Sequence, residues 1–181
     1  MTCVTTFINR VGTVALPFLA LYLTEERHYS ESRAGIAVAC YGFVGFLTAP
    51  YAGPLTDRLG PVRLMRWSLT LAGIILFIVP FMPAYPFVLV SVGLWAACGE
   101  AVRPGSVALL TDSVPAAQKR SAISLYRTAV NLGASVGPAL GGLLAAVSYF
   151  WIFTVDGVTS LLAALFLASS VRSMPSHVPQ A

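Results

Sequence analysis

Long apolar runs separated by short polar breaks dominate the chain. Each run reaches about the 20 residues that a helix needs to cross the hydrocarbon core of a bilayer. None of them alternates polar and apolar positions over about ten residues, as a membrane strand does. The runs cover residues 4–24, 34–56, 64–82, 86–111, 122–147 and 149–171. The pattern therefore predicts an all-α membrane protein whose residues 1–172 form one bundle of six transmembrane helices.

The break between the second and third runs, residues 53–63, reads Gly-Pro-Leu-Thr-Asp-Arg-Leu-Gly-Pro-Val-Arg. Insertion scales assign a charged side chain at mid-bilayer roughly 2.5 to 3.5 kcal/mol. Asp57, Arg58 and Arg63 are therefore expected in water. We interpret the whole segment as a tight charged turn at the membrane surface.

Composition agrees with a membrane location. Hydrophobic residues make up 57% of the chain and charged residues 10%, whereas about a quarter of the residues are charged in an ordinary soluble domain. Mean hydropathy is +0.79. We therefore expect an integral protein of the cell membrane, surrounded by the lipid bilayer.

The positions of the basic residues predict an orientation. Arg27 and Arg33 fall on one side of the membrane, and six basic residues fall on the other: Arg58, Arg63, Arg66, Lys119, Arg120 and Arg172. Because short cytoplasmic loops carry the excess of Lys and Arg, both termini are predicted to be cytoplasmic. The basic residues lie scattered near helix ends and form no patch for nucleic acid, so no nucleic-acid partner is expected.

The residues that enzymes use are not grouped along this chain. Cys3, Cys40 and Cys98 lie in three different apolar runs without the spacing of a metal or disulfide site. We find no metal-ligand cluster, nucleophile-base pair or phosphate-binding loop in the sequence. We therefore predict no catalytic residue, no metal and no cofactor.

Several ionisable or polar residues nevertheless lie inside apolar runs. Glu100 and Arg103 are three residues apart near the middle of the fourth run, on one helical face, where they can pair. The first run adds Asn9 and Arg10, and the sixth adds Asp156. Such groups must face protein or a wet cavity, and they often mark a transport pathway. Two interpretations stay open, a cavity cluster and a structural network of ion pairs.

Small residues repeat at a spacing of four in two runs. The fifth run carries Ala129, Gly133, Gly137, Gly141 and Ala145, and the second carries Gly45, Ala49 and Gly53. Small-xxx-small stripes let helices approach closely in lipid. These stripes either pack the helices of the bundle against one another or form an interface with a partner that is absent from the chain. Their shift by three helices suggests a three-plus-three repeat, and the third run, poor in small residues, is expected to face lipid.

Three groups of residues resemble the signatures of one transporter family. The first group lies between the second and third helices: Gly53, Leu55, Asp57, Arg58 and Gly60, with Arg63 as a later basic residue and Pro61 and Val62 in place of the usual basic pair. The second lies in the fifth helix: Gly133, Gly137, Pro138, Gly141 and Gly142. The third surrounds the connection from the fourth to the fifth helix: Asp112, Arg120 and Arg127. Arg103, within the fourth helix, adds a separate match. Together they resemble the major facilitator superfamily, in particular its bacterial drug:proton antiporters.

The resemblance implies a fold of twelve helices in two bundles, of which this chain is similar to the first. Residues 173–181 would begin the cytoplasmic linker to a C-terminal bundle that is absent here. It further implies that helices one and four line the cavity, helices two and five meet the other bundle, and helices three and six face lipid.

The function implied by the resemblance is proton-coupled efflux of small amphipathic or hydrophobic compounds by alternating access, with the proton as coupling ion. The loop at residues 53–63 would act as a gate. Its implied charge partners are Asp112, Arg120 and Arg127. Our candidates for the cavity and for coupling are the polar and ionisable residues inside the apolar runs, namely Asn9, Arg10, Glu100, Arg103 and Asp156.

A second hypothesis needs no transport by this chain. The six helices would assemble with a second copy or with another chain, and the small-residue stripes would form the seam between them.

Overall fold

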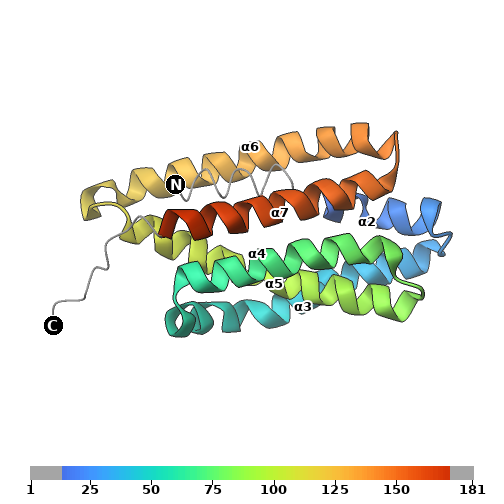
Figure 1. The fold of residues 1–181 in the computed structure, drawn as a ribbon, viewed down its shortest axis with the longest axis horizontal. Coiled ribbons are helices and arrows are strands. Elements are labelled where there is room, and N and C mark those ends of the chain that lie inside the picture. Colours follow the sequence, from blue (N-terminus) through green and yellow to red (C-terminus); the bar gives the residue numbers. More distant parts are fainter. Residues whose placement is uncertain (1–13, 172–181) are drawn as a thin grey trace.

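The computed structural model describes residues 14–171, and all of its regular elements there are helices (Figure 1). The first apolar run is described as α2 (Ala15–Leu21) followed by the π-helical turn η1 (Tyr22–Glu26). The remaining elements are α3 (Glu31–Leu59), α4 (Pro61–Ile78), η2 (Val79–Phe81), α5 (Tyr85–Asp112), η3 (Ala116–Gln118), α6 (Lys119–Ala145) and α7 (Tyr149–Val171). Within the described part, five helices are long and apolar enough to span a membrane, namely α3, α4 with η2, α5, α6 with η3, and α7. The predicted all-α membrane class is confirmed. Asn9, Arg10 and the segment 173–181 lie outside the described residues.

The predicted turn at residues 53–63 is wrong in extent. Helix α3 continues through Pro54 as far as Leu59, and α4 begins at Pro61. The chain reverses at Gly60, whose φ of 81° lies in a region that side chains disfavour. Proline suits the first position of the next helix because its missing N–H needs no partner there. The charged residues of this segment are therefore helical on both sides of a one-residue hinge.

The connection between α5 and α6 is also shorter than the sequence suggested. Asp112 is the last residue of α5, and Arg120 and Arg127 both lie in α6. Only residues 113–118 connect the two helices, with the short η3 inside them. Asp112, Arg120 and Arg127 therefore lie in the helices and not in the connection between them.

The helices pack in an order that fits the predicted three-plus-three repeat. Helix α3 packs against α5, α4 lies against both α5 and α7, and α2 contacts α6 and α7. In such a repeat α2 corresponds to α5, α3 to α6 and α4 to α7. The α3–α5 contact therefore corresponds to the α6–α2 contact, and the α4–α5 contact corresponds to the α7–α2 contact. Each of these pairs is in contact.

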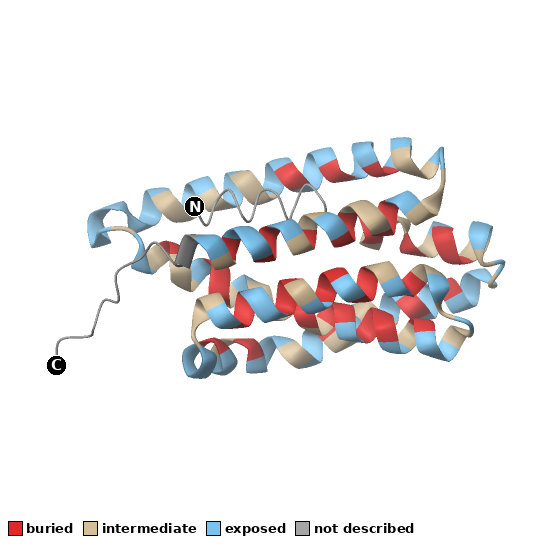
Figure 2. Cartoon of the chain, in the orientation of Figure 1, coloured by how far each residue is buried: buried red, intermediate tan, exposed pale blue. Residues whose placement is uncertain are grey.

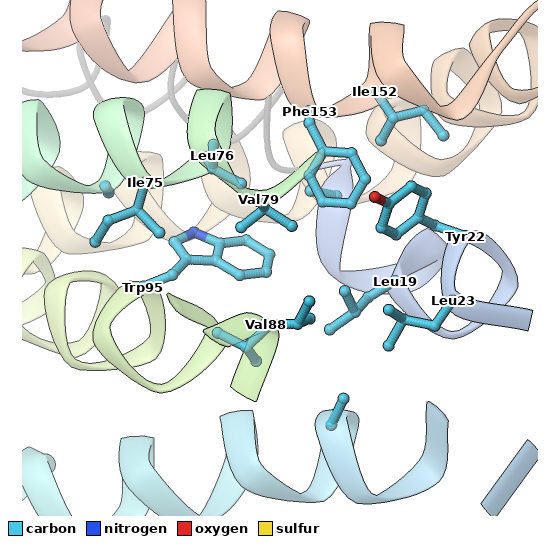
Figure 3. Packing of buried hydrophobic residues seen from close by; sticks show 14 of the residues in the cluster. Leu19, Tyr22, Leu23, Ile75, Leu76, Val79, Val88, Trp95, Ile152 and Phe153 are labelled. Atoms are coloured by element: carbon cyan, nitrogen blue, oxygen red, sulfur yellow. The ribbon is translucent and has the colours of Figure 1, made fainter. Parts of the chain in front are cut away.

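One hydrophobic core joins α2 and η1 to α4, α5 and α7 (Figure 3). Within this core, Tyr22 and Phe153 meet edge to face, with ring centroids 4.7 Å apart. Tyr22, Leu76, Val88 and Phe153 are all buried. Aromatic pairs of this geometry add to the packing of their apolar surfaces, so this end of the bundle is held by interdigitated side chains.

Helices α4 and α7 cross at two glycines. A Cβ at Gly73 would lie 3.0 Å from the Gly157 carbonyl oxygen and 2.8 Å from Leu161 Cγ. A Cβ at Gly157 would in turn lie 3.1 Å from the Gly73 carbonyl oxygen. The two backbones approach so closely that neither position accepts a side chain without movement. In lipid such approach is the main source of attraction between helices.

Burial divides the helices into two groups (Figure 2). In α3 and α6 only 17% of the apolar span is buried, against 44% to 50% in α4, α5 and α7. The third helix, α4, was expected to face lipid, but half of its apolar span is buried in the bundle. One face of α4, including Leu64, Leu69 and Leu76, is buried against α5 and α7.

Candidate functional site

A charged pair lies near the middle of α5. The Glu100 carboxylate is 3.4 Å from the Arg103 guanidinium, measured between Oε1 and Nη1. The Glu100 side chain is 18% exposed and the Arg103 side chain 59%. The structure confirms the pairing expected from their spacing. The acid is largely enclosed by helices, whereas its basic partner extends toward the outside of the bundle.

Helix α3 provides the space that Glu100 occupies. A Cβ at Gly45 would lie 3.5 Å from Glu100 Cγ and 3.7 Å from Oε1. One turn away, the Tyr41 ring meets Trp95 edge to face, with centroids 4.8 Å apart. The small residue at position 45 thus admits the carboxylate between α3 and α5.

Asp156 lies on α7 and points into the bundle. It is buried, and its Oδ2 accepts a hydrogen bond of 3.1 Å from the backbone N–H of Ala15. Ala15 is the first residue of α2, where backbone N–H groups have no partner within the helix. Asp156 therefore ties the start of α2 to α7, and it does not face lipid.

The structure does not bring the implied gate charges into contact. Asp57 and Arg58 are exposed at the end of α3, Asp112 is exposed at the end of α5, and Arg120 and Arg127 are exposed in the N-terminal part of α6. Within residues 14–171, Glu100 and Arg103 make the one recorded ion pair. A carboxylate in the last turn of a helix is disfavoured by the helix dipole. Neither Asp57 nor Asp112 therefore stabilises the helix to which it belongs.

The glycine stripe of α6 faces its own bundle. Gly133, Gly137 and Gly141 are buried, and a Cβ at Gly141 would collide with the Phe18 ring of α2. Pro138 and Gly142 are exposed, and the helix continues past Pro138. Of the two interpretations left open by the sequence, the structure supports packing within the bundle for this stripe.

The stripe of α3 divides between two surroundings. Gly45 is buried beneath Glu100, whereas a Cβ at Gly53 would meet no other atom within 4 Å. Gly53 is therefore free of close neighbours in the described part of the chain.

A cluster of arginine and tyrosine at the opposite end of the bundle was missed by sequence reasoning. Arg27 donates hydrogen bonds to the carbonyl oxygens of Pro80, at 3.0 Å, and Met82. The Tyr85 hydroxyl donates to the Arg33 carbonyl at 2.7 Å, and the Arg33 guanidinium lies 5.6 Å from the Tyr85 ring centroid. The cluster joins the loop before α3 to the loop before α5.

Two further observations concern the same end. The Tyr149 hydroxyl donates to the Glu25 carboxylate, which links η1 to α7. The pKa of Arg27 is raised, chiefly by a hydrogen bond with Tyr29. The enrichment of Arg and Tyr around both loops was the available signal in the sequence.

Comparisons with known proteins agree with this architecture. The sequence model of the Major Facilitator Superfamily matches residues 2–180. An uncharacterized MFS-type transporter of Bacillus subtilis (strain 168), YqjV, is 31% identical over 180 residues, which cover 94% of this chain and 42% of that protein. The quinolone resistance protein NorA of Staphylococcus aureus (strain N315) is 27% identical over 153 residues, covering 84% of this chain and 39% of NorA. The chain thus spans about two fifths of the length of these relatives.

Proposed function

The chain belongs to the major facilitator superfamily, a family of membrane transporters, and we propose that it forms the N-terminal six-helix half of a proton-coupled exporter. The exported compounds are small and amphipathic or hydrophobic. One relative is named for quinolone resistance, which supports substrates of this kind. The observation that carries the proposal is the Glu100–Arg103 pair near the middle of α5.

In this proposal Glu100 alternates between two states. In the first it is ionised and paired with Arg103; in the second it carries a proton and releases the guanidinium. A cationic or polar group of the substrate competes with the proton for the same carboxylate. Because an intramembrane charge is costly without a partner, binding of one ligand disfavours the other. Competition of this kind couples proton entry to substrate exit.

Alternating access then requires a second bundle. In secondary transporters two bundles rock around a site near the membrane midplane. Helices α3 and α6, whose spans are the least buried of the described helices, would meet that bundle. Asp57 and Arg58 would form a latch at the membrane surface, in which the carboxylate binds the N-terminus of a helix in the other bundle. Such a contact stabilises by typically 0.3 to 1 kcal/mol.

The proposal is tested with the full-length gene product in proteoliposomes. A fluorescent amphipathic cation is supplied, and a proton gradient is imposed across the membrane. We expect the compound to accumulate against its own gradient and to be released when a protonophore collapses the pH difference. Movement that follows only the gradient of the compound would contradict proton coupling.

The same preparation distinguishes the second hypothesis of the sequence analysis. We expect one polypeptide with a second set of spanning helices. A stable assembly of six-helix chains without transport would favour a self-assembling or partner-dependent membrane protein.

A further inference from the structure

Two arginines and a tryptophan lie together on the exposed side of the first turns of α4. Arg63, Arg66 and Trp67 are all exposed, and their spacing of three and four residues places them on one helical face. The Arg66 guanidinium lies 6.0 Å from the centroid of the Trp67 ring. The three side chains thus form one continuous surface, which we call the α4 basic surface.

Exposed apolar side chains extend this face along the helix. They are Leu71, Ile74 and Ile78 of α4 and Phe81 of η2. From Arg63 to Phe81 the helix rises about 27 Å, close to the roughly 30 Å of bilayer hydrocarbon. The face therefore changes from guanidinium through indole to aliphatic side chains and ends in an aromatic ring. Tryptophan prefers the level of the lipid headgroups, which places both arginines at the level of the phosphates.

Within residues 14–171, no acidic side chain forms an ion pair with the arginines of the α4 basic surface. Arg58, Lys119 and Arg120 add positive charge at the same end of the bundle, where Asp57 and Asp112 are the nearby acids. A planar guanidinium binds phosphate oxygens with two parallel hydrogen bonds. The ligand that suits this surface is therefore an anion at the depth of the lipid headgroups.

We propose that the α4 basic surface binds the headgroup phosphate of an anionic phospholipid, with Arg63 and Arg66 on the phosphate and Trp67 along the upper acyl chain. The site begins at Arg63, because Pro61 and Val62, the first residues after the Gly60 hinge, carry no charge. A free phosphate ion would contact the arginines but not Trp67 or the apolar face below it. A phospholipid would contact the arginines, Trp67 and the apolar face together.

The test measures quenching of Trp67 by brominated phosphatidylglycerol in the full-length protein in nanodiscs. The emission of Trp67 is obtained as the difference between the protein and its Trp67→Phe variant. Brominated phosphatidylethanolamine serves as the lipid without net charge. We expect phosphatidylglycerol to be enriched at Trp67, and the Arg63→Gln/Arg66→Gln variant to weaken its binding roughly tenfold without changing quenching by phosphatidylethanolamine.

The matched control is Lys119→Gln/Arg120→Gln, which removes the same charge from the same end of the bundle. Equal weakening by both double variants would overturn the proposal, because general surface attraction would then explain it. Absence of any Trp67 quenching would also overturn it, since protein would then cover this face. Displacement of the lipid by inorganic phosphate alone would assign the arginines to a free anion instead. All the substituted residues are exposed, and thermal unfolding in detergent checks that each variant is folded.

Discussion

Glu100 on α5 lies directly over Gly45 on α3, with 3.5 Å between Glu100 Cγ and the position that a Cβ would take at residue 45. This distance is an ordinary van der Waals contact. Helix α3 therefore has room for a methyl group beneath the acid and for little more. A small residue of α3 thus lies against the acid of α5 that is proposed to couple transport to protons.

The first prediction follows from this limited space. Gly45→Leu should push the Glu100 carboxylate away from α3, because overpacking of this kind costs roughly 1 to 3 kcal/mol. We expect gradient-driven transport in proteoliposomes to fall roughly tenfold. Gly45→Ala is the matched control and should transport at nearly the normal rate. Equal rates for the leucine variant and the parent protein would show that the contact has no role.

The second prediction concerns the buried acid of α7. Asp156→Leu leaves the Ala15 N–H without its acceptor, at a cost of roughly 1 to 3 kcal/mol. Asp156→Asn retains a carbonyl oxygen in nearly the same place and should be milder. Thermal unfolding in detergent should rank the parent first, the asparagine variant second and the leucine variant last. If the two variants unfold at the same temperature, the hydrogen bond to α2 does not matter for stability.

The third prediction tests the crossing of α4 and α7. Gly73→Ala and Gly157→Ala place a Cβ within about 3 Å of the opposite backbone, so each should destabilise the protein by roughly 1 to 3 kcal/mol. Gly93→Ala is the control, since its Cβ would meet Val44 at 3.4 Å and alanine favours a helix. Unfolding of all three variants is followed by circular dichroism. A loss for Gly93→Ala as large as for the other two would point to a general intolerance of substitution.

Much of the fold is predictable from hydrophobicity alone, because the bilayer requires long apolar helices. The run at residues 149–171 coincides with α7, and the run at residues 86–111 differs from α5 by one residue at each end. The extent of the turn at residues 53–63 was not predictable in this way. Charges at a membrane surface are solvated whether they stand in a loop or in a helix, so polarity marks the surface and leaves the backbone undetermined.

Residue spacing likewise defines a face of a helix without defining its neighbour. The glycines of α6 were predictable as one stripe, but only the contact of Gly141 with Phe18 shows that the stripe packs inside the bundle. The pair Glu100–Arg103 was predictable because it is local. The bonds of Arg27 to the carbonyl groups of Pro80 and Met82 join positions more than fifty residues apart. Enrichment of Arg and Tyr marks both loops, but it does not show which carbonyl groups Arg27 meets.

The fourth prediction concerns the proposed latch. Asp57→Asn in the full-length transporter should abolish transport and leave membrane insertion intact, because the amide cannot provide the negative charge for a helix N-terminus. Glu31→Gln removes an exposed acid from the other end of α3 and should have little effect. Efflux from vesicles and the amount of inserted protein are measured together. Normal efflux by the Asp57→Asn variant would refute the latch.

The coupling role of Glu100 is tested most directly by the pH dependence of gradient-driven transport. The experiment compares the full-length protein with its Glu100→Gln and Glu100→Asp variants in proteoliposomes. We predict that Glu100→Gln no longer accumulates the amphipathic substrate when a proton gradient is imposed, whereas Glu100→Asp retains accumulation with a shifted pH profile. Accumulation by Glu100→Gln with an unchanged pH profile would contradict the account and would move proton coupling to another acid.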